Sequence, residues 1–187
     1  MPSEDIGTAF DEVSAMPSFD YLTVHLWIEN WGWFQPDQPE TYKLALEKAM
    51  TYLDRHLPVA QSLKKPIVLE EFGMSREGGL FGYDVPTTLR DEYYATIFDY
   101  VLEKATNKEW LVGLNFWSWS GEGKPAQPGE MWKPGDTLTG DPPHELQGWY
   151  SVYTTDESTK AIIRLYASQM NDLHSISGNI VTQSNKD

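Results

Sequence analysis

The sequence of 187 residues contains no cysteine. This absence excludes disulfide frameworks, thiolate zinc sites and cysteine nucleophiles, but it does not decide the cell compartment. Basic residues are also scarce, because 14 Lys and Arg stand against 28 Asp and Glu, giving a formal net charge of −14. Nucleic acids and anionic membranes recruit clustered Lys and Arg, so the sequence predicts neither as a partner. An uncharged substrate fits this charge balance.

Long hydrophobic runs are missing as well. No apolar run approaches the roughly 18 residues that a membrane span needs. The first five residues are acidic and lack the basic start and apolar centre of a signal peptide. If the mature protein is exported, we expect the signal to lie outside this chain. No linker or low-complexity segment divides the sequence, so it predicts one folded domain over residues 1–187.

Aromatic residues are abundant by contrast, with eight Trp and ten Tyr. Many of them follow predicted strands, in segments that carry the signals of loops. Sugar rings have apolar C–H faces that stack on flat aromatic side chains, so the pattern indicates carbohydrate binding, with ordinary packing as the alternative. The clustered residues are Trp27, Trp31, Trp33 and Phe34, then Trp117 and Trp119, then Trp132, Trp149 and Tyr150.

Short aliphatic segments alternate with amphipathic ones along the chain. Strands are predicted over residues 19–27, 65–71 and 110–117, and helices over 40–63, from Thr87 or Thr88 to Thr106, and over 156–170. This alternation is typical of an α/β fold with a parallel sheet.

Other segments carry breaker or loop signals. Pro58 is expected to end or kink the first helix. Residues 121–148 are rich in Pro and Gly, which predicts a long loop of the kind that is usually functional or mobile. The polar residues 175–187 are expected to form a frayed tail.

The second predicted strand ends in two carboxylates, Glu70 and Glu71, followed by Phe72 and Gly73. Barrel enzymes place catalytic groups at the carboxyl ends of buried parallel strands. Neighbouring strand residues point to opposite sides, so we expect one carboxylate to face a site and the other to face packing or a supporting partner. A pair of solvated acids at a strand end is the alternative.

The other two predicted strands also carry polar or aromatic groups toward their carboxyl ends. Those sharing one face are Thr23, His25 and Trp27 in the first strand, and Asn115, Trp117 and Trp119 in the third. A core histidine bonded to a backbone carbonyl and ordinary aromatic packing are the alternatives. Three successive strand ends with such groups nevertheless predict the mouth of a barrel active site.

Together these segments resemble glycoside hydrolase family 5. Val-Leu-Glu-Glu-Phe-Gly at 68–73 is similar to the family's seventh-strand nucleophile motif, and His-Leu-Trp at 25–27 with Asn-Trp-Gly-Trp at 30–33 is similar to its sixth-strand motif. Residues 115–123 resemble the eighth strand and its loop, and residues 21–27 resemble bacterial endo-β-1,4-mannanases. The resemblance covers about residues 15–170. It implies the C-terminal portion, units six to eight, of a (β/α)8 TIM barrel.

The resemblance also implies roles for particular residues. The activity implied is retaining, endo-acting hydrolysis of β-1,4-mannan, with Glu71 as the nucleophile and Glu70 supporting it. His25 belongs to the hydrogen-bond network around the reacting sugar, and Trp117 is the platform beneath that sugar. The further candidates for sugar contact are Trp27, Trp31, Trp33, Trp119 and Asn115. No metal or other cofactor is implied, and the implied location is extracellular or periplasmic.

The sequence departs from the family pattern in two ways. Trp27 stands where the family usually has a Tyr bonded to the nucleophile, and an indole donates only through its N–H. Retaining glycosidases also need two carboxylates about 5–5.5 Å apart, yet the Asn-Glu pair that carries the family's acid/base is absent. Glu122 and Glu130 do not match that motif, although Glu122 remains a remote substitute.

These departures leave alternatives open. We expect that the N-terminal barrel half is supplied elsewhere, for example by a second chain, and that this chain alone is poorly stable or associates. A non-catalytic carbohydrate-binding or structural piece and an endo-β-1,4-glucanase of the same family are the competing interpretations.

Overall fold

The computed structural model describes residues 9–184. The helices are α1 (Phe10–Ser14), α2 (Tyr42–Leu63), α3 (Thr88–Thr106) and α4 (Glu157–Ser184), with 3-10 turns at Pro39–Thr41 and Glu77–Gly79. The strands are β1 (Leu22–Leu26), β2 (Ile67–Phe72), β3 (Leu111–Leu114), β4 (Trp119–Gly121) and β5 (Val152–Tyr153).

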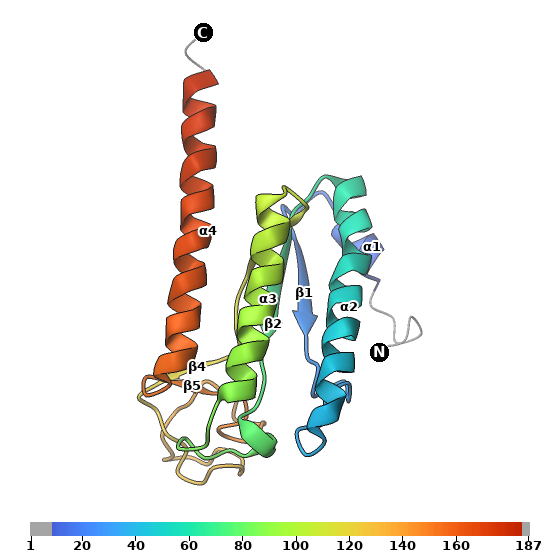
Figure 1. The fold of residues 1–187 in the computed structure, drawn as a ribbon. Helices are drawn as coiled ribbons and strands as arrows, with labels where there is room; N and C mark the ends of the chain where they lie inside the picture. The colour runs from blue at the N-terminus through green and yellow to red at the C-terminus, as the bar shows by residue number, and fades with distance from the viewer. Residues whose placement is uncertain (1–8, 185–187) are drawn as a thin grey trace.

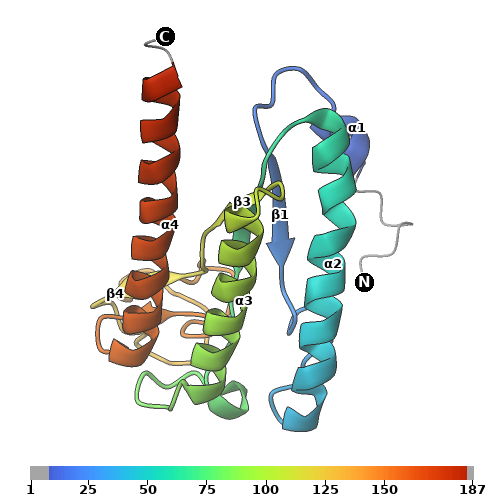
Figure 2. The ribbon, with the colours of Figure 1, turned by 45° about the horizontal axis from the view of Figure 1, so that its top comes forward.

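The main sheet has three parallel strands in the order β1-β2-β3. The helices α2, α3 and α4 lie side by side, with α3 in the middle, in both ribbon views (Figures 1 and 2). A small second sheet pairs β4 with β5 in parallel. The strand–helix alternation and the parallel sheet confirm the predicted α/β class.

One face of the sheet is buried beneath the helices. In β1, the buried residues Leu22, Val24 and Leu26 alternate with the exposed Thr23 and His25. The buried side chains join apolar residues of α2 and α3 in one core, where each fully covered aliphatic or aromatic side chain contributes about 1.5–3 kcal/mol. The other face, with Thr23 and His25, stays open to solvent.

Pro58 does not end the first long helix, because α2 continues to Leu63. Pro58 is exposed, so water can satisfy the carbonyl that loses its intrahelical partner. Its neighbours Leu57 and Ala60 pack against the core and hold the helix on course. The helix then stops at Lys64, whose left-handed φ of 57° reverses the chain.

Several boundaries differ from the predicted ones. The third strand stops at Leu114 and is followed by the short β4, which the sequence does not predict. The loop predicted over residues 121–148 is present, but Gly121 belongs to β4 and the irregular segment runs from 122 to 151. The helix α4 runs past Met170 to Ser184, so the chain from Ser175 to Ser184 is helical where the sequence predicts a frayed tail, and residues 185–187 lie outside the described residues.

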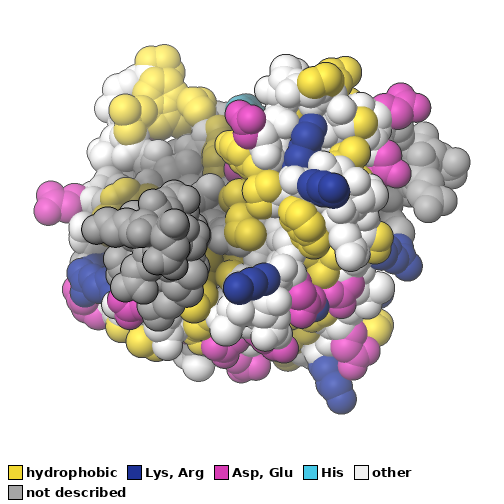
Figure 3. Space-filling view, turned by 90° about the horizontal axis from the view of Figure 1, so that it is seen from above, with side chains coloured by type: hydrophobic (Ala, Val, Ile, Leu, Met, Phe, Trp, Pro, Cys, Tyr) yellow, Lys and Arg dark blue, Asp and Glu magenta, His cyan; other side chains and the backbone are white. Residues whose placement is uncertain are grey.

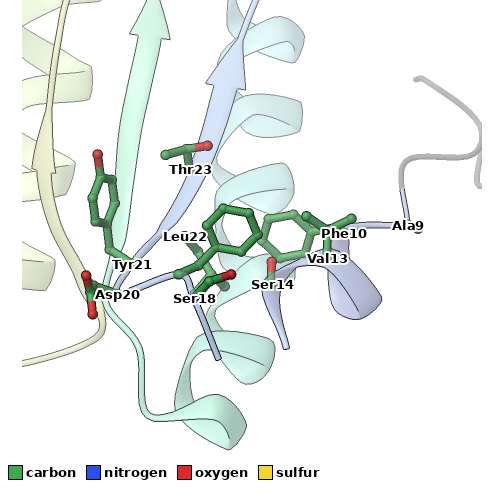
Figure 4. A pocket seen from close by; sticks show the side chains of 10 residues that line it. Ala9, Phe10, Val13, Ser14, Ser18, Asp20, Tyr21, Leu22 and Thr23 are labelled. Atoms are coloured by element: carbon green, nitrogen blue, oxygen red, sulfur yellow. The ribbon is translucent and has the colours of Figure 1, made fainter. Parts of the chain in front are cut away.

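The amino end of β1 borders an apolar hollow. It measures about 720 Å³ and lies between α1 and residues 18–23, as Figure 4 shows. Val13, Phe19 and Tyr21 line it and are 46%, 43% and 49% exposed. Seen from this end, hydrophobic side chains gather in the middle of the surface beside several Lys and Arg side chains, and acidic side chains lie mostly toward the rim (Figure 3).

Candidate active site

A register shift between β1 and β2 forms the centre of the candidate site. His25 lies opposite Glu71, although the residue before it lies opposite Leu69, so β2 contains one extra residue at this point. A bulge of this kind bends a strand and re-aims its side chains. Leu69 and Phe72 are accordingly buried, whereas Glu70 and Glu71 between them are both partly exposed.

Both carboxylates reach the same imidazole. His25 Nδ1 lies 3.0 Å from Glu71 Oε2, and His25 Nε2 lies 3.9 Å from Glu70 Oε2. The prediction that Glu70 and Glu71 face opposite ways is therefore wrong, because the bulge interrupts strand alternation. The predicted neighbourhood of His25 and Glu71 is present, with their side chains 44% and 29% exposed.

Aromatic rings gather next to this triad. The Trp27 ring meets the Trp117 ring edge-on at 6.2 Å and lies 5.1 Å from the Tyr150 ring. Gly73 permits this close approach, since a Cβ there would lie 2.6 Å from the Trp117 carbonyl oxygen and 3.2 Å from the Trp27 ring. The Trp117–Ser118 peptide bond is cis, and the buried Trp117 Nε1 has no hydrogen-bond partner among the residues that the structure describes.

Trp31 and Trp33 occupy a different environment. Their rings lie 4.8 Å apart and contact Tyr52 of α2 at 5.0 and 6.2 Å. Trp33 is only 7% exposed, and Trp31 packs partly buried against the same core. Their contact with a sugar stays a prediction. The segment folds back after β1, with the Trp33 N–H donating to the Ile28 carbonyl at 2.9 Å.

Two other predicted contacts lie on exposed positions. The Trp119 side chain, on β4, is 51% exposed. Asn115 is exposed just after β3, where its backbone N–H donates to the Leu69 carbonyl at 2.9 Å. Glu122 is also exposed, and Glu130 pairs with Lys133 at 2.8 Å. Their roles toward a substrate stay predictions.

Glu145 is a further carboxylate near the site that sequence reasoning does not single out. Burial raises its pKa, the negative charges of Asp141 and Glu71 raise it further, and His144 opposes them. Glu145 therefore lies within electrostatic reach of Glu71. Glu145 lies in the long loop, 122–151, and belongs to no recognisable motif. The sequence could indicate its role only if it showed that this loop folds back toward Glu71.

Buried polar bonds fix the end of the long loop. The Asp141 carboxylate accepts the N–H groups of Gly148 and Tyr150 at 2.7 and 3.0 Å and the hydroxyl of Ser151. Asp141 is 4% exposed and the loop residues that it binds are also buried. Buried carboxylates are stable when backbone donors satisfy them, so this part of the loop has a defined conformation.

A buried cluster of charges lies behind the site. Arg76 and Arg90 contact Asp156 Oδ2 at 2.6 and 2.8 Å, and the three side chains are 1%, 0% and 5% exposed. These bonds join the segment after β2 to α3 and to the start of α4. Burial opposes ionisation of Asp156, but hydrogen bonds from Arg76 and the Tyr153 N–H, with the charges of Arg90 and Arg76, outweigh it and lower its pKa.

Between residues 9 and 173, whose side chains the structure describes, His, Asp and Glu form no group of three or more suited to a metal ion. In the same part of the chain, no helix combines the length and apolar character of a membrane span.

Solved structures include two informative neighbours. A glycoside hydrolase family 5 mannosidase from Rhizomucor miehei is 36% identical with a TM-score of 0.78, over 89% of this chain and 41% of that one. An endo-β-1,4-mannanase from Thermotoga petrophila is 20% identical with a TM-score of 0.54, over 87% of this chain and 28% of that one. The second likeness shows the fold alone, and family 5 is a TIM-barrel family.

Curated relatives and a family profile agree with these neighbours. Mannan endo-1,4-beta-mannosidase 5 of Arabidopsis thaliana is 28% identical over 122 residues, and mannan endo-1,4-beta-mannosidase 1 of Oryza sativa subsp. japonica is 31% identical over 113. They align with 65% and 60% of this chain, which spans only about a quarter of their own length, 26% and 24%. The profile described as GH family 5 beta-mannosidase-like matches residues 3–175. The resemblance seen in the sequence is thus confirmed, and the chain belongs to the β-mannosidase-like members of glycoside hydrolase family 5.

Proposed function

We propose that the enzyme containing this chain cleaves β-1,4-mannan internally, with retention of configuration. The observation that carries this proposal is the contact of His25 with Glu71 at 3.0 Å, at the carboxyl ends of two parallel strands and beside indole rings. Indole faces suit the apolar face of a sugar, and a carboxylate at this place suits attack on its anomeric carbon.

Glu71 is the proposed nucleophile. Its carboxylate attacks the anomeric carbon and forms a glycosyl–enzyme ester, which water then hydrolyses. An N–H of His25 donates to the Glu71 carboxylate and holds the attacking oxygen in place. This hydrogen bond replaces the one that a Tyr donates to the nucleophile elsewhere in the family. Glu70, 3.9 Å from the other ring nitrogen, orients the imidazole from its far side.

A second carboxylate must protonate the leaving oxygen and then activate water. We propose that it comes from the N-terminal half of the barrel, in the same polypeptide or in a second chain. The units β1-α2, β2-α3 and β3-α4 then correspond to units six, seven and eight. In support, within residues 9–184 the outer edges of β1 and β3 pair with no further strand. Parallel sheets are normally covered on both faces.

An exo-acting β-mannosidase is the second candidate. It is favoured by the description of the matching profile and by the 36% identity to the Rhizomucor miehei mannosidase, against 20% to the endo-mannanase. Both candidates use the same chemistry at Glu71 and differ in which bond of the polymer is cut. A location outside the cell or in the periplasm follows from a polysaccharide substrate and belongs to the same proposal.

Product analysis separates the candidates. The chain and the complete enzyme are incubated with mannan, with manno-oligosaccharides and with a soluble cellulose derivative, and the released sugars are measured. Internal cleavage of mannan yields mixed oligosaccharides early, whereas an exo-enzyme yields mannose from the start. Release from the cellulose derivative alone indicates the endoglucanase alternative. Sugar binding without release by the complete enzyme contradicts the proposal and favours a non-catalytic binding piece.

A further inference from the structure

Glu29, in the segment after β1, is a partly buried carboxylate that the proposed mechanism does not use. Its Oε1 accepts the Ser75 N–H at 2.6 Å and its Oε2 accepts the Trp149 indole N–H at 3.4 Å. Among the side chains described, those of residues 9–173, no ion pair includes Glu29. Withdrawing a carboxylate from water without a cation beside it costs free energy, so the position of Glu29 indicates that the hydrogen bonds it accepts are needed.

These bonds join three segments at the mouth of the site. Glu29 follows β1, Ser75 follows β2, and Trp149 belongs to the returning end of the long loop. The next residue, Asn30, accepts the hydroxyl of Tyr150 at 2.5 Å. Two consecutive residues thus hold two consecutive residues that lie 120 positions further along the chain. We call Glu29, Asn30, Ser75, Trp149 and Tyr150 the clasp.

The clasp connects directly to the aromatic rings of the site. The rings of Trp149 and Tyr150 stack at 4.9 Å with planes only 13° apart. Tyr150 lies 5.1 Å from Trp27, which in turn meets Trp117. A Cβ on Gly73 would lie 3.4 Å from Tyr150 Cδ1 as well as against both indole residues, so these groups pack without spare room. Displacement of Tyr150 would therefore disturb the rings beside Glu71.

We propose that Glu29 and Asn30 are positioning residues that hold the long loop against the mouth and thereby set how tightly the sugar at Glu71 is bound. This inference rests on the proposed function of that site. Glu29 and Asn30 bond to the loops and not to the reacting carboxylate. Their loss therefore affects sugar binding more than bond cleavage.

The structural test is hydrogen exchange on the complete enzyme, comparing Glu29→Ala and Glu29→Gln with the control Glu40→Gln. Glu40 is an exposed glutamate in the 3-10 turn of the same segment. In Glu29→Ala the amides of residues 147–151 should exchange roughly tenfold faster, as the loss of a hydrogen bond to a charged group predicts. Amides of β2 should be unchanged. Glu29→Gln keeps an acceptor for Ser75 and should show a smaller increase.

The functional test uses the complete enzyme and the same variants with a β-mannoside substrate. Glu29→Ala should raise KM roughly tenfold and leave kcat within about twofold, the signature of lost substrate binding. Asn30→Ala removes only the acceptor for the Tyr150 hydroxyl and should also raise KM. This variant replaces Glu29→Ala in the test if Glu29→Ala does not fold.

Three results would overturn the inference: unchanged exchange at residues 147–151, equal acceleration in β2, or a loss of kcat at constant KM. A wild-type enzyme that releases no sugar would refute the proposed function instead. The exchange measurement would then still decide whether the clasp holds the loop.

Discussion

The two ends of the parallel sheet differ in what surrounds them. At the carboxyl ends, His25, Glu70 and Glu71 meet beside indole rings, and buried charges such as Asp156 lie close behind. At the amino ends, α1 borders an apolar hollow. The Lys65 ammonium holds the end of α1 and the segment after it, because it donates to the carbonyls of Ser14 and Met16 at 2.7 Å. The carboxyl end thus gathers titratable and aromatic side chains, the arrangement in which barrel enzymes place their sites, whereas the amino end gathers apolar ones.

The largest effect is expected at the carboxyl end. Glu71→Ala in the complete enzyme should lower kcat by about a thousandfold or more, because the nucleophile acts in bond cleavage itself. Sugar binding should remain largely intact, as measured by calorimetry with a manno-oligosaccharide. Glu40→Gln is the control, since that glutamate is exposed and the proposed mechanism does not use it. Turnover near the wild-type level in Glu71→Ala would contradict the assignment.

The buried charges behind the site should dominate stability. Arg90→Ala removes one of the two guanidinium partners of Asp156 and should lower the free energy of unfolding by about 3–5 kcal/mol, because a buried charge loses its compensation. Urea titration of the chain measures this. Arg164→Ala, at an exposed position of α4, should stay within about 0.5 kcal/mol. An equal loss of unfolding free energy in both variants would show that the buried charge cluster does not dominate stability.

The same cluster of Arg76, Arg90 and Asp156 predicts that the free energy of unfolding falls at acid pH. The pKa of Asp156 is lowered in the folded state, so its ionisation stabilises the fold above the unfolded-state value of about 3.9. This contribution should disappear as the pH falls through the lower, folded-state pKa. The free energy of unfolding should therefore fall less steeply below about pH 4 in Asp156→Asn than in the wild type. Parallel pH profiles would show that Asp156 makes no such contribution.

The smallest change in stability is expected at the amino end. Phe19→Ser alters a side chain that is 43% exposed, so the free energy of unfolding should change by about 0.5 kcal/mol or less. Self-association of the chain should nevertheless decrease, because an exposed apolar surface is reduced. Light scattering after size exclusion measures this, with Leu138→Ser in the long loop as the control. A wild-type chain that is a clean monomer with one cooperative thermal transition would contradict the expectation that it associates.

Much of the fold could be predicted because its signals are local. The aliphatic run before Glu70 specifies β2, and the apolar spacing around Leu53 specifies α2, since periodicity reflects burial on one face. The meeting of His25 with Glu71 followed from parallel strands that end at one edge. The predicted end of the helix at Pro58 is wrong, because a proline interrupts a helix less where water can reach the carbonyl that loses its partner. The local sequence does not show which helix face is exposed.

The sequence by itself determined the strand–helix order, the carboxylates at a strand end and the absence of an Asn-Glu pair. Only the tertiary structure decided that Glu70 joins Glu71 at His25, because a bulge depends on pairing between strands. It also decided that Trp33 is buried and that Glu29 holds Trp149. These outcomes depend on contacts between residues far apart in the chain, and no local pattern encodes such contacts.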